Sequence, residues 1–396
     1  MRTLGITTVV LFFLLALTTC KKPYNPTIVS TDKSYLVVEG VINSGNDSTF
    51  ITLSHTIKLN AQQYMPETGA RVNVESDKND VYPLSEVKPG IYSIAQLNLP
   101  ADRKYRLHIF ASKGEYASDY VENKTTPPID SIYSQITKSG VQFYADSHDP
   151  TGKTRYYRWD YDETWTYFSL IHSQYLYTNH HLVFRNPDSL VDVCYRHARP
   201  SNSFYVATSN KLSQDVISHF PVGYVDVSSG KLNHVYSLHL KEYAITPEAF
   251  TFWENLKKNT EQLGSIFDAQ PSTIRGNIHP IGDNAEPVIG FVSVSTITDK
   301  RIFFAGRQLP YELPKHIDGA PDNDQCVEGV VPVAPPESLD FRLEQTFASG
   351  DTLPAVAIVS KVTFKIVGYS YAPRVCIDCR VVGGTTIRPD YWPIGL

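Results

Sequence analysis

The stretch Lys104-Tyr105-Arg106-Leu107-His108-Ile109-Phe110 shows most plainly how this chain folds. Apolar and charged side chains alternate along it, so a β-strand would bury one face and expose the other. Similar short runs surround it, with glycines between them, and we expect strands over residues 35–42, 49–54, 70–75, 91–95, 104–111 and 115–121. Strands at this spacing predict an immunoglobulin-like or prealbumin-like β-sandwich over residues 32–126.

The run Thr125-Thr126-Pro127-Pro128 marks the end of this sandwich, because proline lacks the N–H that a central strand needs. We expect residues 127–396 to form a larger β-rich domain, fibronectin-like with insertions. One long strand in it would carry an aromatic face made of Tyr157, Trp159, Tyr161, Trp165 and Tyr167. That face would either pack in a sheet or serve as a ligand platform. Glu163 interrupts this aromatic face, and because an unpaired buried charge is costly, its side chain must be paired, exposed to solvent or moved out of the face by a β-bulge.

Residues 170–233 lose this periodicity and accumulate Tyr, Ser, Asn and His, which predicts a long irregular insertion. Such insertions often carry recognition surfaces, although a decorated loop has the same pattern. The insertion and the aromatic strand therefore supply candidate contact residues for a ligand or a partner. These candidates are Trp159, Trp165, Tyr175, Tyr177, His180 and His181.

One amphipathic helix is expected over residues 247–263, because Thr246 can cap its first turn and Pro247 fits its first position. A stripe at helical spacing would pack this helix against a sheet. The stripe consists of Ala249, Trp253, Leu256, Thr260 and Leu263. Beyond the helix we expect a hairpin made of residues 288–297 and 301–305, and then a strand over residues 356–366.

Four cysteines follow position 20, and in an exported chain an even number favours disulfides. A bridge from Cys326 to Cys376 or Cys379 would hold the C-terminal tail, and the remaining cysteine could then reach Cys194. The C-x-x-C spacing of Cys376 and Cys379 also fits a zinc half-site or a redox pair. However, no second half-site stands at a usable spacing, and the pair follows a strand-like run rather than opening a helix. We therefore expect two structural disulfides and no metal.

The N-terminus carries an apolar run, residues 9–17, with Arg2 ahead of it and Leu17-Thr18-Thr19-Cys20 behind it. This pattern predicts a lipoprotein signal peptide over residues 1–19 and lipid attachment at Cys20. A membrane-spanning helix needs about 20 apolar residues, more than this run supplies. A secretory peptide without lipid attachment remains the alternative. Residues 20–31 would then form a lipidated tether on a membrane surface.

Composition and motifs exclude several functions. The 25 Tyr, 18 Phe and 26 Pro against 2 Met suit strands and loops, and the net charge of −5 is spread without a basic stripe for nucleic acid. Phosphate-binding glycine loops, the nucleophile elbow and the zinc-binding helix motif are absent, so we expect no cofactor and no catalytic residue. The acidic loop 146–152 lacks the spacing of an EF-hand, and we expect a turn rather than a calcium site there.

Several motifs resemble a family of Bacteroidota envelope lipoproteins known as domain of unknown function 4249. They are Leu36-Val37-Val38-Glu39-Gly40, Tyr156-Tyr157-Arg158-Trp159, Glu248-Ala249-Phe250 with Trp253, residues 263–272, Pro287-Val288-Ile289-Gly290-Phe291 and the ending Pro389-Asp390-Tyr391-Trp392. The resemblance implies an outer-membrane lipoprotein, often encoded beside a TonB-dependent transporter, with an accessory role in uptake. Surface-exported lipoproteins of such cells tend to carry acidic residues after the lipidated cysteine, whereas this chain has Lys21-Lys22-Pro23. The resemblance therefore leaves open whether the chain faces the cell surface or the periplasm.

Three functional hypotheses follow from these patterns. The chain is expected to be a non-catalytic binding lipoprotein that helps a TonB-dependent transporter capture a peptide, glycan or chelate. The alternatives are an assembly module that binds envelope proteins through sheet edges, and a hydrolase with a site assembled from distant residues. A deep pocket lined by Trp or Tyr would count against the assembly module.

Overall fold

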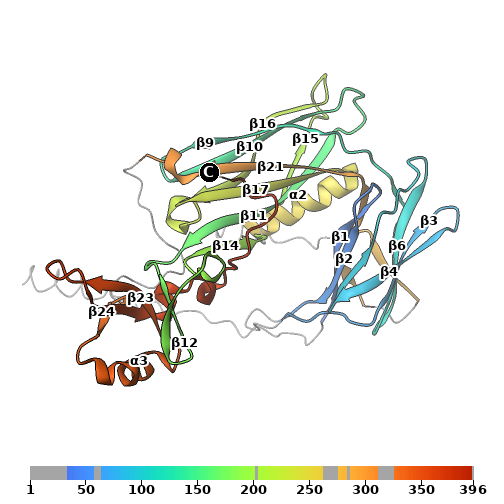
Figure 1. Ribbon diagram of the computed structural model, residues 1–396. Helices are drawn as coiled ribbons and strands as arrows, with labels where there is room; N and C mark the ends of the chain where they lie inside the picture. Colours follow the sequence, from blue (N-terminus) through green and yellow to red (C-terminus); the bar gives the residue numbers. More distant parts are fainter. Residues whose placement is uncertain are drawn as a thin grey trace, which may run out of the picture.

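The computed structural model describes residues 34–57, 64–200, 204–261, 275–282, 286–310 and 325–394. The expected signal peptide, Cys20 and the tether lie outside the described residues. The chain is mainly β, as expected from its alternating patterns. Figure 1 shows three parts: an N-terminal sandwich mostly in blue and cyan, a second sandwich in teal, green, yellow and orange, and a C-terminal unit mostly in orange and red. Within the described part of the chain, no helix is both long enough and apolar enough to cross a bilayer.

The N-terminal sandwich forms where the short alternating runs were expected. Its strands are β1 (Leu36–Asn43), β2 (Thr49–His55), β3 (Arg71–Ser76), β4 (Val81–Lys88), β5 (Ile91–Ile94), β6 (Lys104–Ala111), β7 (Gly114–Ser118) and β8 (Val121–Glu122). In β6 the side chains of Tyr105, Leu107 and Ile109 are buried, which confirms the alternation read from the sequence. Strand β4 pairs with β3 on one side and β5 on the other, and so joins the two layers around one apolar core.

Three later strands also belong to this sandwich, which corrects the expected domain division. They are β18 (Ile278–Ile281), β19 (Val288–Ile289) and β20 (Ser293–Ser295). Strand β18 pairs with β7, while β19 and β20 run parallel to β1. The expected hairpin of residues 288–297 and 301–305 is therefore wrong. Neighbouring parallel strands come from distant segments, so local alternation could not show which strand they join.

The second sandwich packs a three-stranded sheet on a five-stranded one. The first holds β9 (Ile129–Ile136), β10 (Gly140–His148) and β16 (Val216–Asp226); the second holds β11 (Tyr156–Phe168), β14 (Val193–Ala198), β15 (Phe204–Thr208), β17 (Val235–Ala244) and β21 (Ile297–Ala305). The aromatic face of β11 is buried, as the packing interpretation expected: four of its five rings lie in this core, and Tyr167 packs beside Cys194 and Cys379. The interrupting Glu163 is paired: it accepts hydrogen bonds from Lys231 and from the hydroxyl of Tyr236, 3.0 Å away.

Much of the expected irregular insertion is regular sheet, which corrects that expectation. Strands β14, β15 and β16 lie inside residues 170–233, and Val222 and Val225 of β16 are buried in the core. The register between β10 and β16 shifts at two places, and His219 has a positive φ of 52°. Such bulges break the two-residue period, so the sequence of β16 does not alternate like that of an ordinary strand.

The helix α2 (Pro247–Glu261) begins as expected, because the hydroxyl of Thr246 accepts a hydrogen bond from the backbone N–H of Ala249 at 3.2 Å. Of its expected stripe, Ala249 is buried, Trp253 and Leu256 are half-buried and Thr260 is exposed. Leu263 lies outside the described residues. The helix packs against the second sandwich, and Figure 1 shows it facing the N-terminal sandwich.

The C-terminal unit is a small sheet with a helix and a neighbouring hairpin. It comprises β12 (Tyr175–Thr178), β13 (His181–Phe184), β22 (Gly329–Pro332), α3 (Leu339–Phe347), β23 (Thr352–Val359), β24 (Ile366–Pro373) and α4 (Arg374–Ile377). The strand expected over residues 356–366 is wrong, since β23 ends at Val359 and β24 begins at Ile366. The alternating apolar residues continue through the turn between the two strands, and the sequence pattern therefore hid that turn.

Two disulfides hold the C-terminal unit to the second sandwich and to itself. Cys194 of β14 bonds to Cys379, and Cys326 bonds to Cys376. This confirms the expected structural disulfides, and it assigns Cys376 and Cys379 to different bonds. The C-x-x-C pair is therefore neither a zinc half-site nor a redox couple in this fold.

The core of the second sandwich also holds a carboxyl group, that of Glu242. It accepts hydrogen bonds from the indole N–H of Trp159 at 2.6 Å and from the hydroxyl of Ser147. Its other oxygen, Oε1, is buried and has no partner within the described structure. Burial raises the pKa of Glu242 from its ordinary 4.5 to about 7, and the charges of Asp130 and Asp215 act in the same direction.

Because burial favours the neutral form of this carboxyl in the folded protein, we expect the free energy of unfolding to fall as the pH rises. The neutral form contributes stability that is fully present below about pH 4.5 and is lost as the pH rises through about 7. We expect a loss of roughly 3 kcal/mol across this window, and Glu242→Gln should remove most of it. Urea denaturation of both proteins between mildly acidic and mildly alkaline pH measures the difference. Equal pH dependence in the two proteins would contradict the assignment to Glu242.

Candidate functional site

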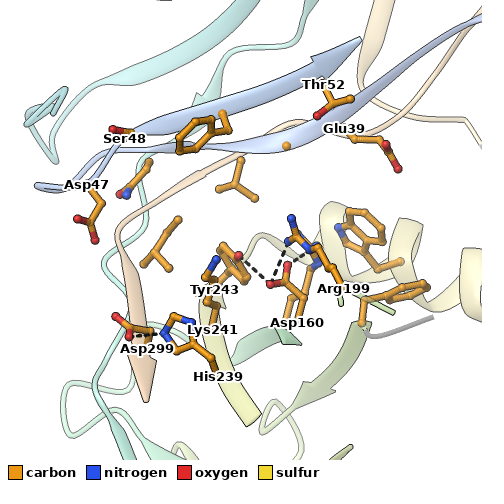
Figure 2. A pocket seen from close by; sticks show the side chains of 18 of the residues that line it. Glu39, Asp47, Ser48, Thr52, Asp160, Arg199, His239, Lys241, Tyr243 and Asp299 are labelled. Atoms are coloured by element: carbon orange, nitrogen blue, oxygen red, sulfur yellow. Dashed lines mark hydrogen bonds and ion pairs between the residues drawn. The ribbon is translucent and has the colours of Figure 1, made fainter. Parts of the chain in front are cut away.

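A cleft of about 750 Å³ lies between the N-terminal sandwich and the second sandwich. One wall comes from β1, β2 and the turn between them. The opposite wall comes from β11, β15, β17, β21, the middle of α2 and the segment that follows β14. Figure 2 shows the side chains of the two walls directed into the space between them. The lining includes Glu39, Gly40, Asp47, Ser48, Phe50 and Thr52 on the first wall, and Arg158, Asp160, Arg199, His239, Lys241, Tyr243, Trp253 and Asp299 on the second.

Asp160 is the centre of the polar network on the second wall. Although it is 4% exposed, it has three partners around its carboxylate. Arg158 Nη2 donates to Oδ2 at 3.0 Å, the hydroxyl of Tyr243 donates to Oδ1 at 3.1 Å, and Arg199 Nη2 lies 3.3 Å from Oδ1. Figure 2 shows the last two of these contacts. The carboxylate therefore holds the two arginines and the tyrosine in fixed positions.

Further ion pairs continue this network along the same sheet face. Lys241 Nζ donates to Asp162 Oδ2 at 3.1 Å, and His239 Nε2 lies 2.6 Å from Asp299 Oδ2. Arg199 also lies 3.8 Å from Asp162 through its Nε atom. The face thus alternates positive and negative groups across neighbouring strands, an arrangement that stabilises each charge by its neighbours.

The pKa shifts follow from burial and from these neighbours. Burial opposes ionisation of Asp162, but the charge and hydrogen bond of Lys241 lower the pKa of its carboxyl below the ordinary value. Burial and then the charge of Asp160 raise the pKa of Tyr243. For Arg199, burial lowers the pKa, but the charges of Asp160 and Asp162 outweigh it and raise the pKa above the ordinary value. All three groups therefore keep their ordinary charge states at neutral pH.

Local backbone geometry brings the first wall together. Gly40 lies in β1 with a positive φ of 142°, and a side chain there would place its Cβ 2.5 Å from the backbone oxygen of Phe50. A glycine at this position lets β1 and β2 approach closely. The ring of Phe50 is 56% exposed on this wall, beside the exposed Glu39 and the half-buried Thr52.

The structure does not bring the sequence-predicted contact residues together. Trp159 and Trp165 are buried in the second sandwich, which leaves them no surface for a ligand and corrects that expectation. Tyr175 and Tyr177 are half-buried in β12, and Tyr177 packs 5.5 Å from the ring of Phe347. The remaining two candidates, His180 and His181, are exposed at the turn between β12 and β13. The β12–β13 hairpin belongs to the C-terminal unit, away from the cleft.

The cleft lies on the charged face of β11, whereas the contact residues expected from the sequence were on its aromatic face. Since adjacent strand residues point to opposite faces, burying Trp159 directs Arg158 and Asp160 to the cleft side. The sequence did contain a signal for this face, because Arg158 and Asp160 are the charged residues that alternate with the aromatic residues of β11. Within the described residues, no three or more His, Cys, Asp or Glu side chains form a group able to hold a metal ion.

Comparison with known proteins places the chain in a family. A family model described as a domain of unknown function (DUF4249) matches residues 21–301, more than half of the chain. The chain belongs to the DUF4249 family. The match includes both cleft walls, because every cleft residue lies within it. In this DUF4249 protein the C-terminal unit, apart from β12 and β13, lies beyond the matched region.

Two solved structures illustrate what this DUF4249 protein is similar to. A two fibronectin type III domain segment from chicken tenascin is 13% identical and covers 53% of this chain and 91% of its own, with a TM-score of 0.14. The Yersinia pseudotuberculosis adhesin InvE is 12% identical and covers 53% of this chain and 55% of its own, with a TM-score of 0.15. No curated protein matches the chain.

Proposed function

We propose that this protein is a non-catalytic outer-membrane lipoprotein that binds a polar ligand in the cleft between its two sandwiches. In this role it is an accessory partner of a TonB-dependent transporter in nutrient uptake. The observation that carries the proposal is the cleft itself, in which two separate sandwiches contribute polar side chains to one space. Binding sites are commonly found at such interfaces between domains.

The lining charges favour a ligand with little net charge. Four carboxylates line the cleft, those of Glu39, Asp47, Asp160 and Asp299, against the cations Arg158, Arg199 and Lys241. Most of these groups on the second wall already pair with each other, so a strongly charged ligand would have to break existing ion pairs. A neutral glycan or a zwitterionic peptide can instead hydrogen-bond to both signs of charge.

The aromatic side chains that line the cleft also favour a glycan or a peptide as the ligand. The exposed ring of Phe50 faces the cleft from one wall, while Tyr243 and Trp253 line the other. Sugar rings and peptide side chains both bury apolar surface against such rings while their polar groups meet the charges beside them. An aromatic-lined cleft also counts against the assembly-module alternative, which requires no ligand space.

The experiment compares Arg199→Ala with wild type for binding to a panel of neutral oligosaccharides and short peptides. The Arg199 side chain is 57% exposed, so its removal should leave the fold intact. We expect the affinity for the recognised ligand to fall about tenfold or more, because a central arginine carries much of the binding energy in such sites. Isothermal titration calorimetry measures the change.

Arg103→Ala is the matched control, because that arginine pairs with Asp80 on the surface of the N-terminal sandwich, outside the cleft lining. Its affinity should equal that of wild type. Equal binding by the Arg199 variant would remove the cleft as the site. The accessory role is tested separately: the full chain, cross-linked in cells and purified from detergent extracts, should carry a TonB-dependent transporter, and its absence would refute that role.

A further inference from the structure

The turn between β23 and β24, residues 360–365, holds two apolar side chains in solvent. Val362 is 86% exposed and Phe364 is 82% exposed, more than the other large apolar side chains of this hairpin. Three more apolar residues, Val359, Ile366 and Val367, are partly exposed at the adjoining strand ends. Figure 1 shows this hairpin at the edge of the molecule, in the C-terminal unit. We call residues 359–367 the apolar tip.

The apolar tip is an ordered structure. The backbone N–H of Ser360 donates to the carbonyl of Lys365 at 2.9 Å, and that of Phe364 donates to the carbonyl of Ser360 at 2.9 Å. The hydroxyl of Ser360 accepts further hydrogen bonds from the N–H groups of Val362 and Thr363. Phe364 has a positive φ of 55°, an uncommon conformation for a bulky residue. The turn therefore keeps Phe364 in solvent instead of folding it against the sheet.

Two lysines stand beside these apolar side chains. Lys361 precedes Val362 and Lys365 follows Phe364, and both are exposed. Among the described residues, neither lysine forms an ion pair. The tip thus combines an apolar surface with positive charge in a chain whose net charge is −5.

We propose that the apolar tip inserts into an anionic lipid surface. Apolar side chains flanked by lysine enter the boundary between headgroups and acyl chains, while the ammonium groups stay at the phosphate level. A second copy of this chain fits less well, because a symmetric contact between two tips would bring four lysines together. Protein interfaces are also depleted in lysine. The contact is separate from the cleft and does not depend on the ligand proposed for it.

The test uses residues 21–396 without the lipid and measures cosedimentation with vesicles. Binding to mixed phosphatidylglycerol and phosphatidylcholine vesicles should exceed binding to phosphatidylcholine alone, and should weaken as salt is added. Val362→Ser combined with Phe364→Ser should lower the vesicle affinity on the order of tenfold. Lys361→Gln combined with Lys365→Gln should lower it on the order of tenfold and abolish the salt dependence.

A matched control replaces two exposed valines of the N-terminal sandwich, Val81→Ser combined with Val87→Ser, which should bind vesicles like wild type. Insertion itself is read from Phe364→Trp, whose fluorescence should be quenched by brominated lipid in anionic vesicles. Unquenched fluorescence, or equal binding by all variants, would overturn the proposal. A dimer in sedimentation that disappears with Val362→Ser and Phe364→Ser would instead assign the tip to contact between copies.

Discussion

Replacing Asp160 with alanine is expected to lower the free energy of unfolding by about 3 to 5 kcal/mol, as removal of one partner from a buried ion pair does. The 9% exposed Arg158 would lose its carboxylate partner, and its guanidinium would remain buried beside Trp253. Tyr243 would lose the acceptor for its hydroxyl at the same time. Urea denaturation followed by tryptophan fluorescence measures the change.

Asp80→Ala is the control for this prediction, because the carboxylate of Asp80 also pairs with an arginine but is 45% exposed. Its loss should cost less than about 1 kcal/mol, since water replaces the partner of an exposed charge. A loss for Asp160→Ala no larger than that of the control would show that the network adds nothing to stability. Asp160→Asn separates charge from shape, because asparagine keeps an acceptor for Tyr243 but not the negative charge.

Replacing Cys194 and Cys379 together with serine is expected to lower the free energy of unfolding by a similar amount, about 3 to 5 kcal/mol. The bond closes a loop of 185 residues, so its removal enlarges the unfolded ensemble greatly. Both cysteines are fully buried, and Gly384 packs so closely that a Cβ there would lie 2.5 Å from Cβ of Cys194. Unfolding in urea under non-reducing conditions gives the difference.

The same substitution should also release the C-terminal tail. Trp392 packs 5.3 Å from Tyr195 and 5.5 Å from Phe303, while Arg301 lies 3.7 Å from the ring centre of Tyr391. Limited proteolysis should therefore cut the variant near its C-terminus sooner than wild type. Cys326→Ser combined with Cys376→Ser is the control, because this bond spans 50 residues and should leave the tail protected. Equal protection of all three proteins would argue that the tail is held by packing alone.

Local patterns predicted much of the fold. The alternation in β6 and β11, the cap and proline of α2, and the even number of cysteines each depend on neighbouring residues, and each agrees with the structure. The failures share one cause. The strands β19 and β20, the bulged β16 and the turn after β23 are set by distant partners or by a broken period, which a local pattern does not record.

In the candidate site, too, local patterns predicted some features, whereas contacts between distant segments decided the others. The sequence predicted that one face of β11 would be buried, but not that the opposite face would meet the wall formed by β1 and β2. It also could not pair Asp160 with Arg199 or Tyr243, because those contacts join segments far apart in the chain. The sequence by itself determined the strands, the helix start and the cysteines available for bonding. Only the tertiary structure decided the cleft, the disulfide partners and the apolar tip, because these arise where separate segments pack together or where packing leaves a side chain uncovered.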